Sequence, residues 1–221
     1  MKLLDKGSIE LVDYSGSDKR IVDAARVSIA QGKGTKKDTE LIEYLIDNKH
    51  TSPFEHVVFT FLVKCPVFVA RQWMRHRTWS YNEVSRRYTS EDIEFHVPSK
   101  LRRQDAVNKQ SSSGNLDNDA DLIQRIENWN SMSLSFYNLL IDSGVAREQA
   151  REILPVNLYT SFYGTVDLHN LFHFLELRHH PHAQEEIRVY AQAIEEIIKP
   201  VVPIAYDAWK EKENRQKKQV I

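Results

Sequence analysis

One short segment of the chain concentrates side chains suited to bind an anion. It holds five arginines and one acidic residue, namely Arg71, Arg75, Arg77, Arg86 and Arg87 with Glu83. Guanidinium groups form paired hydrogen bonds with phosphate or carboxylate, whereas the whole chain has a formal net charge of only -1. The segment therefore predicts a local anion site rather than a protein-wide field. On charge alone, a solvated basic helix end paired with acids elsewhere explains the cluster about as well.

Aromatic and short polar side chains lie between these arginines. Ser80, Asn82 and Ser85 are suited to hydrogen-bond a phosphate or a ribosyl hydroxyl. An RNA-binding surface is a second interpretation, because several aromatic rings are available to stack on bases. These rings belong to Trp73, Trp79, Tyr81 and Tyr88.

Five histidines form another concentration near the C-terminal third of the chain. They are His169, His173, His179, His180 and His182. The i,i+4 spacing of His169 and His173, with Glu176 nearby, makes a metal site a third interpretation. The order HExxH is absent and no cysteine lies near, so we expect these histidines on a helix surface or facing a ligand, with no metal.

Hydrophobic patterns predict the elements that position these residues. Residues 57–69 are rich in β-branched and aromatic side chains and predict a strand, which Pro66 ends or bulges before a helix begins. Weaker strands are predicted within 1–15 and at 91–99. Helices are predicted near 21–29, 38–48, 120–143, 146–153, 167–178, 182–198 and after 203, with a polar loop at 32–38. The fold class is α+β: one domain over residues 1–221, with a small antiparallel sheet packed with several long helices, and with 101–119 as a mobile loop.

The composition limits the cellular setting and the type of binding site. The single cysteine, Cys65, excludes an internal disulfide, and its apolar surroundings predict a buried, inert thiol. The N-terminal residues lack the pattern of a signal peptide, and no apolar stretch approaches the ~20 residues that span a membrane. We therefore expect a cytoplasmic protein with neither a membrane nor a nucleic acid as partner. Seven glycines without a GxGxxG or GxxxxGK order argue against a Rossmann domain.

The order of residues in the arginine segment resembles a known signature. Arg75-His76-Arg77, seven further residues and Ser85 reproduce the RHR-x7-S motif of flavin-dependent thymidylate synthases. The longer form, RHR-x2-S-x-N-E-x-S-x-R-Y, runs without a gap from Arg75 to Tyr88. Similar family segments are ARVS at 25–28, HTSPFEH at 50–56, LPVNLYT at 154–160, and LR with HAQ at 177–178 and 182–184. The resemblance covers most of the chain, except the N-terminal residues, 101–119 and the C-terminal tail.

This resemblance implies an enzyme that methylates dUMP to dTMP with bound FAD, methylenetetrahydrofolate and NADPH, without a cysteine nucleophile. It also implies a homotetramer whose active sites are shared between subunits. The residues implied at the flavin are Ser52, Arg75, His76, Arg77, Glu83, Asp167, Leu168, His169 and His173. The residues implied at dUMP are Gln72, Trp73, Met74, Arg75, Glu83, Val84, Ser85, Arg86, Arg87, Arg151 and Arg178. Arg178 is the catalytic candidate, because a guanidinium beside the uracil stabilises negative charge on the ring and raises electron density at C5.

Overall fold

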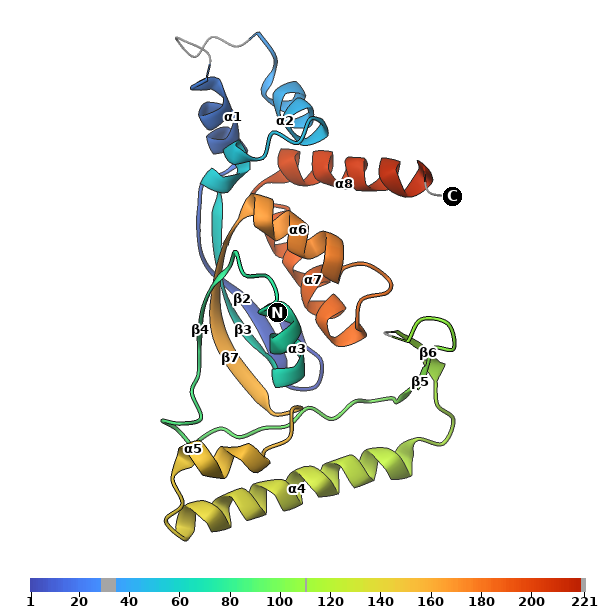
Figure 1. Cartoon of the computed structure of the whole chain (residues 1–221). Coiled ribbons are helices and arrows are strands. Elements are labelled where there is room, and N and C mark those ends of the chain that lie inside the picture. The colour runs from blue at the N-terminus through green and yellow to red at the C-terminus, as the bar shows by residue number, and fades with distance from the viewer. Residues whose placement is uncertain (29–34, 110, 220–221) are drawn as a thin grey trace.

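An antiparallel sheet forms the centre of the computed structural model, which describes residues 1–28, 35–109 and 111–219 (Figure 1). Its strands lie in the order β1-β2-β3-β7-β4. They are β1 (Lys2–Leu3), β2 (Gly7–Ser15), β3 (Val58–Pro66), β7 (Tyr159–Asp167) and β4 (Ser80–Glu83). The register of β3 against β7 is continuous, from Val58 opposite Asp167 to Pro66 opposite Tyr159. Buried and half-buried residues alternate along β3, as expected for a sheet with one face in the core.

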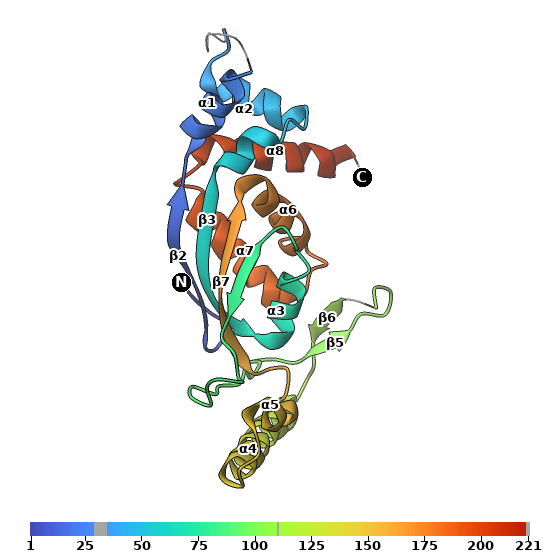
Figure 2. The same ribbon diagram turned by 60° about the vertical axis from the view of Figure 1, so that its left-hand side comes forward.

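Three helices cover that face of the sheet, and no helix of the described residues covers the other face (Figure 2). The covering helices are α3 (Val67–Trp73), α6 (Leu168–Arg178) and α7 (Glu185–Ile198). At one end of the sheet lie α1 (Asp18–Arg26), α2 (Asp38–Asp47), the short 3-10 helix η1 (Ser52–His56) and α8 (Pro203–Gln219). At the other end lie α4 (Ala120–Asp142), α5 (Arg147–Ala150) and the 3-10 helix η2 (Arg151–Ile153). No described helix is both long and apolar enough to cross a membrane.

Two of the covering helices continue directly from strands of the sheet. Pro66 is the last residue of β3 and the N-cap of α3. Asp167 is the last residue of β7 and the N-cap of α6, where its carboxylate accepts a hydrogen bond from the Asn170 backbone N–H at 3.0 Å. Because no loop intervenes, the sheet fixes the direction of both helices.

The core under α3 and α6 is aromatic. The fully buried ring of Trp73 lies 4.8 Å from Phe174, 5.4 Å from Phe162 and 5.7 Å from Trp79, measured between ring centroids. The contacts with Phe162 and Trp79 are edge-to-face, and such packing adds to the stabilisation from burial. A Cβ on Gly7 would lie 2.1 Å from the hydroxyl oxygen of Tyr190, so β2 approaches α7 as closely as only glycine permits.

The architecture confirms the α+β class, the strand-to-helix change at Pro66 and the long helices. The strand predicted at 91–99 is wrong: only a single bridge joins Phe95 to Leu158, because Asp5 takes the Val97 N–H and Pro98 has none to give. The sequence interpretation also missed β4 and β7. The predicted helix at 21–29 begins earlier, at Asp18.

The polar segment 101–119 is more ordered than its composition indicates. It contains a small hairpin of β5 (Arg102–Gln104) and β6 (Ser112–Asn115). Asp119 anchors it by accepting the Leu101 N–H at 2.7 Å. The loop prediction is therefore wrong for these two strands, while mobility of the segment stays a prediction. Residues 32–34 of the polar loop predicted at 32–38 lie outside the described residues, and Asp38 already begins α2.

Candidate functional site

The five clustered arginines have different environments. The Arg86 guanidinium donates to the backbone carbonyls of Glu91 and Asp92, so it braces the loop after β4. Arg87 is exposed and lies 3.9 Å from the Glu148 carboxylate. The other three, Arg71, Arg75 and Arg77, are exposed and make no side-chain hydrogen bond or ion pair within the described part of the chain. Unpaired guanidinium groups favour an anion site over a charge-balanced helix end.

The buried His76, just after α3, and the half-buried Arg178, at the end of α6, form a pair. The Arg178 Nε–H donates to Nε2 of His76 at 3.0 Å, and Arg178 Nη2 donates to the Gln72 carbonyl at 3.2 Å. Because Nε2 of His76 accepts, this bond assigns the ring proton to Nδ1 in the neutral imidazole. Burial, followed by the positive charge of Arg178, lowers the pKa of His76 to about 4. The guanidinium of Arg178 is therefore held in a fixed direction against a neutral ring.

Residues predicted to bind dUMP meet in a pocket of about 390 Å³ beside the start of β7. The predicted residues that line it are Glu83, Val84, Ser85, Arg86 and Arg151. Glu83 accepts a hydrogen bond from the Thr160 hydroxyl at 2.6 Å. Arg151 Nε donates to the Glu148 carbonyl at 3.3 Å, so Arg87 and Arg151 contact the same residue from different segments. The structure thus brings the loop after β4 together with α5 and η2.

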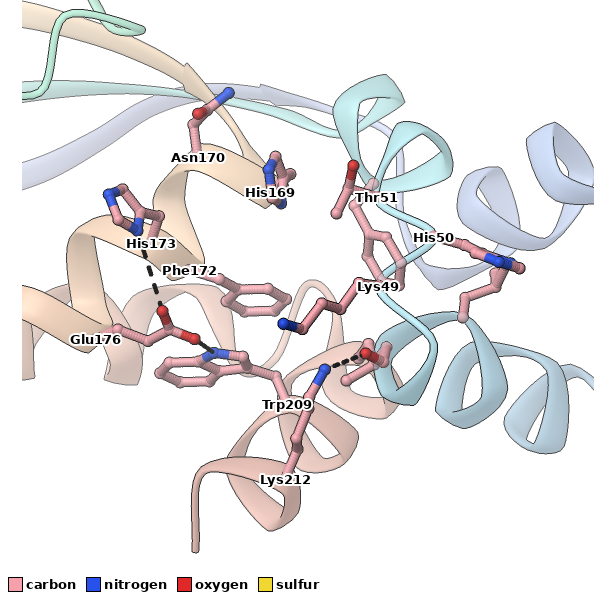
Figure 3. A pocket seen from close by; sticks show the side chains of 13 residues that line it. Lys49, His50, Thr51, His169, Asn170, Phe172, His173, Glu176, Trp209 and Lys212 are labelled. Atoms are coloured by element: carbon pink, nitrogen blue, oxygen red, sulfur yellow. Dashed lines mark hydrogen bonds and ion pairs between the residues drawn. The ribbon is translucent and has the colours of Figure 1, made fainter. Parts of the chain in front are cut away.

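Whereas Glu83 lines the smaller pocket, two of the residues predicted at the flavin line a second pocket, of about 580 Å³, near the opposite end of β7 (Figure 3). His169 and His173 of α6 line this pocket, together with Thr51, whose neighbour Ser52 is exposed on η1. The His173 ring lies 6.0 Å from the ring of His76. The pocket is therefore adjacent to the His76–Arg178 pair.

Several predicted ligand residues have structural roles instead of side chains free to bind. The side chains of Trp73 and Leu168 are fully buried in the core, and Met74 packs against it. Asp167 uses both carboxylate oxygens on Asn170, at 3.0 Å to the backbone N–H and 2.6 Å to the side-chain amide. Any ligand contact of Trp73 or Leu168 would therefore involve their backbone.

The cysteine, the aromatic residues and the histidines bear on the alternative interpretations. Cys65 is fully buried, and burial raises the pKa of its thiol, which confirms the prediction of an inert environment. Trp73 and Trp79 are both core residues, so two of the four rings proposed to stack on RNA bases are inaccessible. Among the described residues, no group of three or more His, Cys, Asp or Glu side chains is arranged to hold a metal ion.

The sequence interpretation missed some residues that complete these pockets. Lys49, Phe172, Trp209 and Lys212 line the larger pocket, and Thr160 lines the smaller one. Thr160 was within reach of sequence analysis, because it lies in the quoted segment 154–160. Lys49 and Lys212 had no local signal, since charged residues after a helix or on its solvent side are common.

Known structures share this arrangement. The chain is similar to the crystal structure of a UMP/dUMP methylase, PolB from Streptomyces cacaoi, bound with 5-Br dUMP, with a TM-score of 0.85 and 36% identity over 96% of this chain and 97% of that one. The form bound with 5-Br UMP gives the same TM-score at 37% identity, with the same coverage. The fold is therefore that of a nucleotide methylase of this kind.

Relatives at the sequence level narrow this class. Residues 10–204 match the family described as "Thymidylate synthase complementing protein". Three proteins named flavin-dependent thymidylate synthase are similar: one from Thermus thermophilus with 53% identity, over 95% of this chain and 77% of the relative; one from Treponema denticola with 50%, over 92% and 79%; and one from Borreliella burgdorferi with 42%, over 94% and 82%. The chain belongs to the flavin-dependent thymidylate synthase family.

Proposed function

We propose that the protein converts dUMP to dTMP, using FAD, with methylenetetrahydrofolate as carbon donor and NADPH as reductant. The observation that carries the proposal is the half-buried guanidinium of Arg178, fixed by a neutral His76 and by the Gln72 carbonyl. Membership of the family and the likeness to a UMP/dUMP methylase support the same reaction. We place the reaction in the cytoplasm.

Four of the residues predicted at dUMP divide into two roles, phosphate binding and activation of the uracil. Ser85 and Arg151 line one pocket, and Arg87 lies beside it through Glu148, which both arginines contact. Together they provide a hydroxyl and two guanidinium groups for the phosphate. Arg178 directs its guanidinium to the uracil, where it stabilises negative charge as C5 becomes nucleophilic. Because His76 is neutral, it orients Arg178 without adding a competing positive charge.

The side chains around the larger pocket fit FAD. Arg75 and Arg77 do not line this pocket, but they flank His76 in sequence, and their exposed, unpaired guanidinium groups provide the cations that the FAD diphosphate requires. His169 and His173 line a pocket large enough for a ring system. Bound FAD supplies the reducing equivalents for the methylation. Cys65, being buried, takes no part.

We also infer that a homotetramer completes the active site. Within the described residues, no hydrogen bond or ion pair joins Arg178 to Ser85, Arg87 or Arg151, so the dUMP residues form two separate groups. In addition, α4 carries exposed apolar side chains with the i, i+3, i+7, i+10 spacing of a helix-packing stripe. They are Trp129, Met132, Phe136 and Leu139, each at least half exposed. A second copy of this chain buries such a stripe and brings the two groups together.

Spectroscopy and product analysis test the reaction. The purified protein is expected to be yellow with flavin absorbance, and to form dTMP only when dUMP, methylenetetrahydrofolate and NADPH are all present. A colourless protein that binds no FAD, or dTMP formation independent of folate, would contradict the proposal.

Hybrid sites test the shared active site. Arg178→Ala and Arg87→Ala chains, each impaired alone at a dUMP concentration well below saturation, are expected to regain activity there when they are dissociated and reassembled together. A hybrid combines an intact Arg178 from one chain with an intact Arg87 from another. If mixed oligomers form but stay inactive, each site is built within one chain.

A further inference from the structure

The larger pocket has two lysines that the residues predicted at FAD and dUMP do not include. Lys49 follows α2 and Lys212 lies on α8, and both side chains reach into the pocket (Figure 3). Lys212 donates to the Ile46 carbonyl. Within the described part of the chain, neither ammonium group has a carboxylate partner at ion-pair distance.

The electrostatics of this wall favour an incoming anion. Burial lowers the pKa of Lys212, and the positive charges of Lys49 and Arg215 lower it further. The carboxylates of Asp47 and Glu176 have the opposite effect on this pKa. Two like charges that share a partly buried wall repel each other, and an anion between them relieves this repulsion.

Glu176 also lines this pocket, but its carboxylate contacts other residues and not the two lysines. Glu176 accepts the indole N–H of Trp209 at 3.4 Å, and its second oxygen lies 4.0 Å from Nδ1 of His173. The ring of Trp209 stacks on Phe172, with centroids 4.7 Å apart and an interplanar angle of 3°. The pocket thus combines an apolar aromatic wall with a cationic wall.

We propose that Lys49 and Lys212 form a subsite for the anionic group of a planar substrate that comes to the flavin. Two substrates have this chemistry: methylenetetrahydrofolate with its glutamyl carboxylates, and NADPH with its 2′-phosphate. The proposal rests on the proposed function, which brings both molecules to this protein. His173 connects the pocket to the active centre, since its ring lies 6.0 Å from His76, which holds Arg178.

Charge-neutral variants of the FAD-loaded enzyme test the subsite. Lys49→Gln, Lys212→Gln and the double variant keep a similar side-chain length. Because Gln carries a Cβ as Lys does, the substitution adds no backbone strain at Lys49, which has a positive φ of 56°. Lys19→Gln is the matched control, because Lys19 is an exposed lysine on α1 that pairs with Asp23 and does not line the pocket. Lys49→Arg and Lys212→Arg keep the positive charge, so they are expected to bind the anionic substrate as wild type does.

Two measurements separate the two sources of the anion. The first compares NADPH with NADH in anaerobic flavin reduction. The second compares methylenetetrahydrofolate with its pteroate analogue, which lacks the glutamate. The double variant is expected to raise the KM of either NADPH or folate by at least about tenfold, the effect of one lost charge-assisted contact. If the lysines bind the 2′-phosphate, the KM of NADH is expected to be the same in the variant and in wild type. If they bind the glutamyl carboxylates, the same is expected for the KM of the pteroate analogue.

Two results would overturn the subsite. One is an unchanged KM for both substrates in the double variant. The other is weaker FAD retention with both KM values unchanged in reconstituted enzyme, which would assign the lysines to the flavin itself. Failure of the proposed function has a different signature, because wild-type protein would then form no dTMP.

Discussion

Arg178 and Arg87 differ in how the fold holds a guanidinium group. Arg178 is half-buried and bound to a buried imidazole and a backbone carbonyl, so its direction is fixed. Arg87 is exposed and lies 3.9 Å from one carboxylate. An exposed ion pair of this kind contributes at most about 1 kcal/mol, so a phosphate readily replaces Glu148. The difference indicates that Arg178 supplies orientation and Arg87 supplies charge.

Removing the fixed guanidinium is expected to have the largest effect. Arg178→Ala should lower the rate of dUMP-dependent oxidation of reduced flavin by at least about a hundredfold, as for other preorganised charge-stabilising groups. Arg178→Lys keeps a charge but loses the planar fork and the Nε donor to His76, and a loss of at least about tenfold is expected. Single-turnover stopped-flow at saturating dUMP and folate measures both. A wild-type rate there would leave Arg178 with a binding or structural role only.

The neutral state of His76 predicts a pH dependence of stability. The pKa of His76 falls from 6.5 to about 4 on folding, so the folded chain binds fewer protons than the unfolded chain between these values. The stabilisation is therefore complete above pH 6.5 and is lost as the pH falls toward 4. Between pH 6.5 and pH 5 the loss should be about 2 kcal/mol.

Urea denaturation at pH 7.5, 6 and 5 measures this loss. His76→Gln, which retains an acceptor for Arg178, is expected to flatten the curve, and Lys19→Gln is expected to leave it unchanged. A histidine that titrates near pH 6.5 in NMR spectra and is assigned to His76 would contradict the buried neutral ring.

Changes at the exposed arginine are expected to be smaller and to affect binding alone. Arg87→Ala should weaken dUMP binding by about tenfold, or 1.4 kcal/mol, with FAD still bound. Glu148→Gln removes the competing carboxylate and should tighten dUMP binding by a few-fold. Titration of dUMP against flavin absorbance measures both. If Glu148→Gln weakens binding instead, Glu148 positions Arg87 rather than competing with the phosphate.

The smallest effect is expected at the thiol. Cys65→Ala should keep dTMP formation within several-fold of wild type, because Cys65 is fully buried in β3. Loss of turnover in a folded, flavin-loaded variant would assign a chemical role to Cys65. A lower melting temperature with normal turnover is the result expected from the loss of a core side chain.

Local signals in the sequence predicted much of the fold. Pro66 ended a β-rich run, and Asp38 lies in the first turn of α2, where the sequence placed a helix start. The strand at 159–167 was missed although its residues are largely β-branched or aromatic, because its first residues were interpreted only as part of a motif. The prediction of a strand at 91–99 was wrong because of a residue distant in the chain. Asp5 accepts the hydrogen bond of the Val97 N–H, which a neighbouring strand would otherwise need.

For the candidate site, the sequence predicted which residues lie together but not which of them are buried or cap a helix. Motif order grouped Glu83 to Arg87 with Arg151, and the structure brings most of them to one pocket. The sequence did not reveal that Trp73 packs in the core or that Asp167 caps α6, because burial and capping depend on neighbours distant in the chain. Lys49 and Lys212 are 163 positions apart in the sequence and converge only through the packing of α2 against α8.

The direct continuation of β3 into α3 and of β7 into α6 limits how the site can open. A hinge needs a few residues whose backbone angles are free to change, and neither junction contains such residues. His76 and Arg178 therefore move with the sheet as one rigid body. Entry and release of ligands are therefore expected to depend on segments outside these two junctions, such as the loop after β4 and the segment 101–119. Substitutions in those segments are thus the ones expected to change how long a product stays bound, while leaving the catalytic geometry as it is.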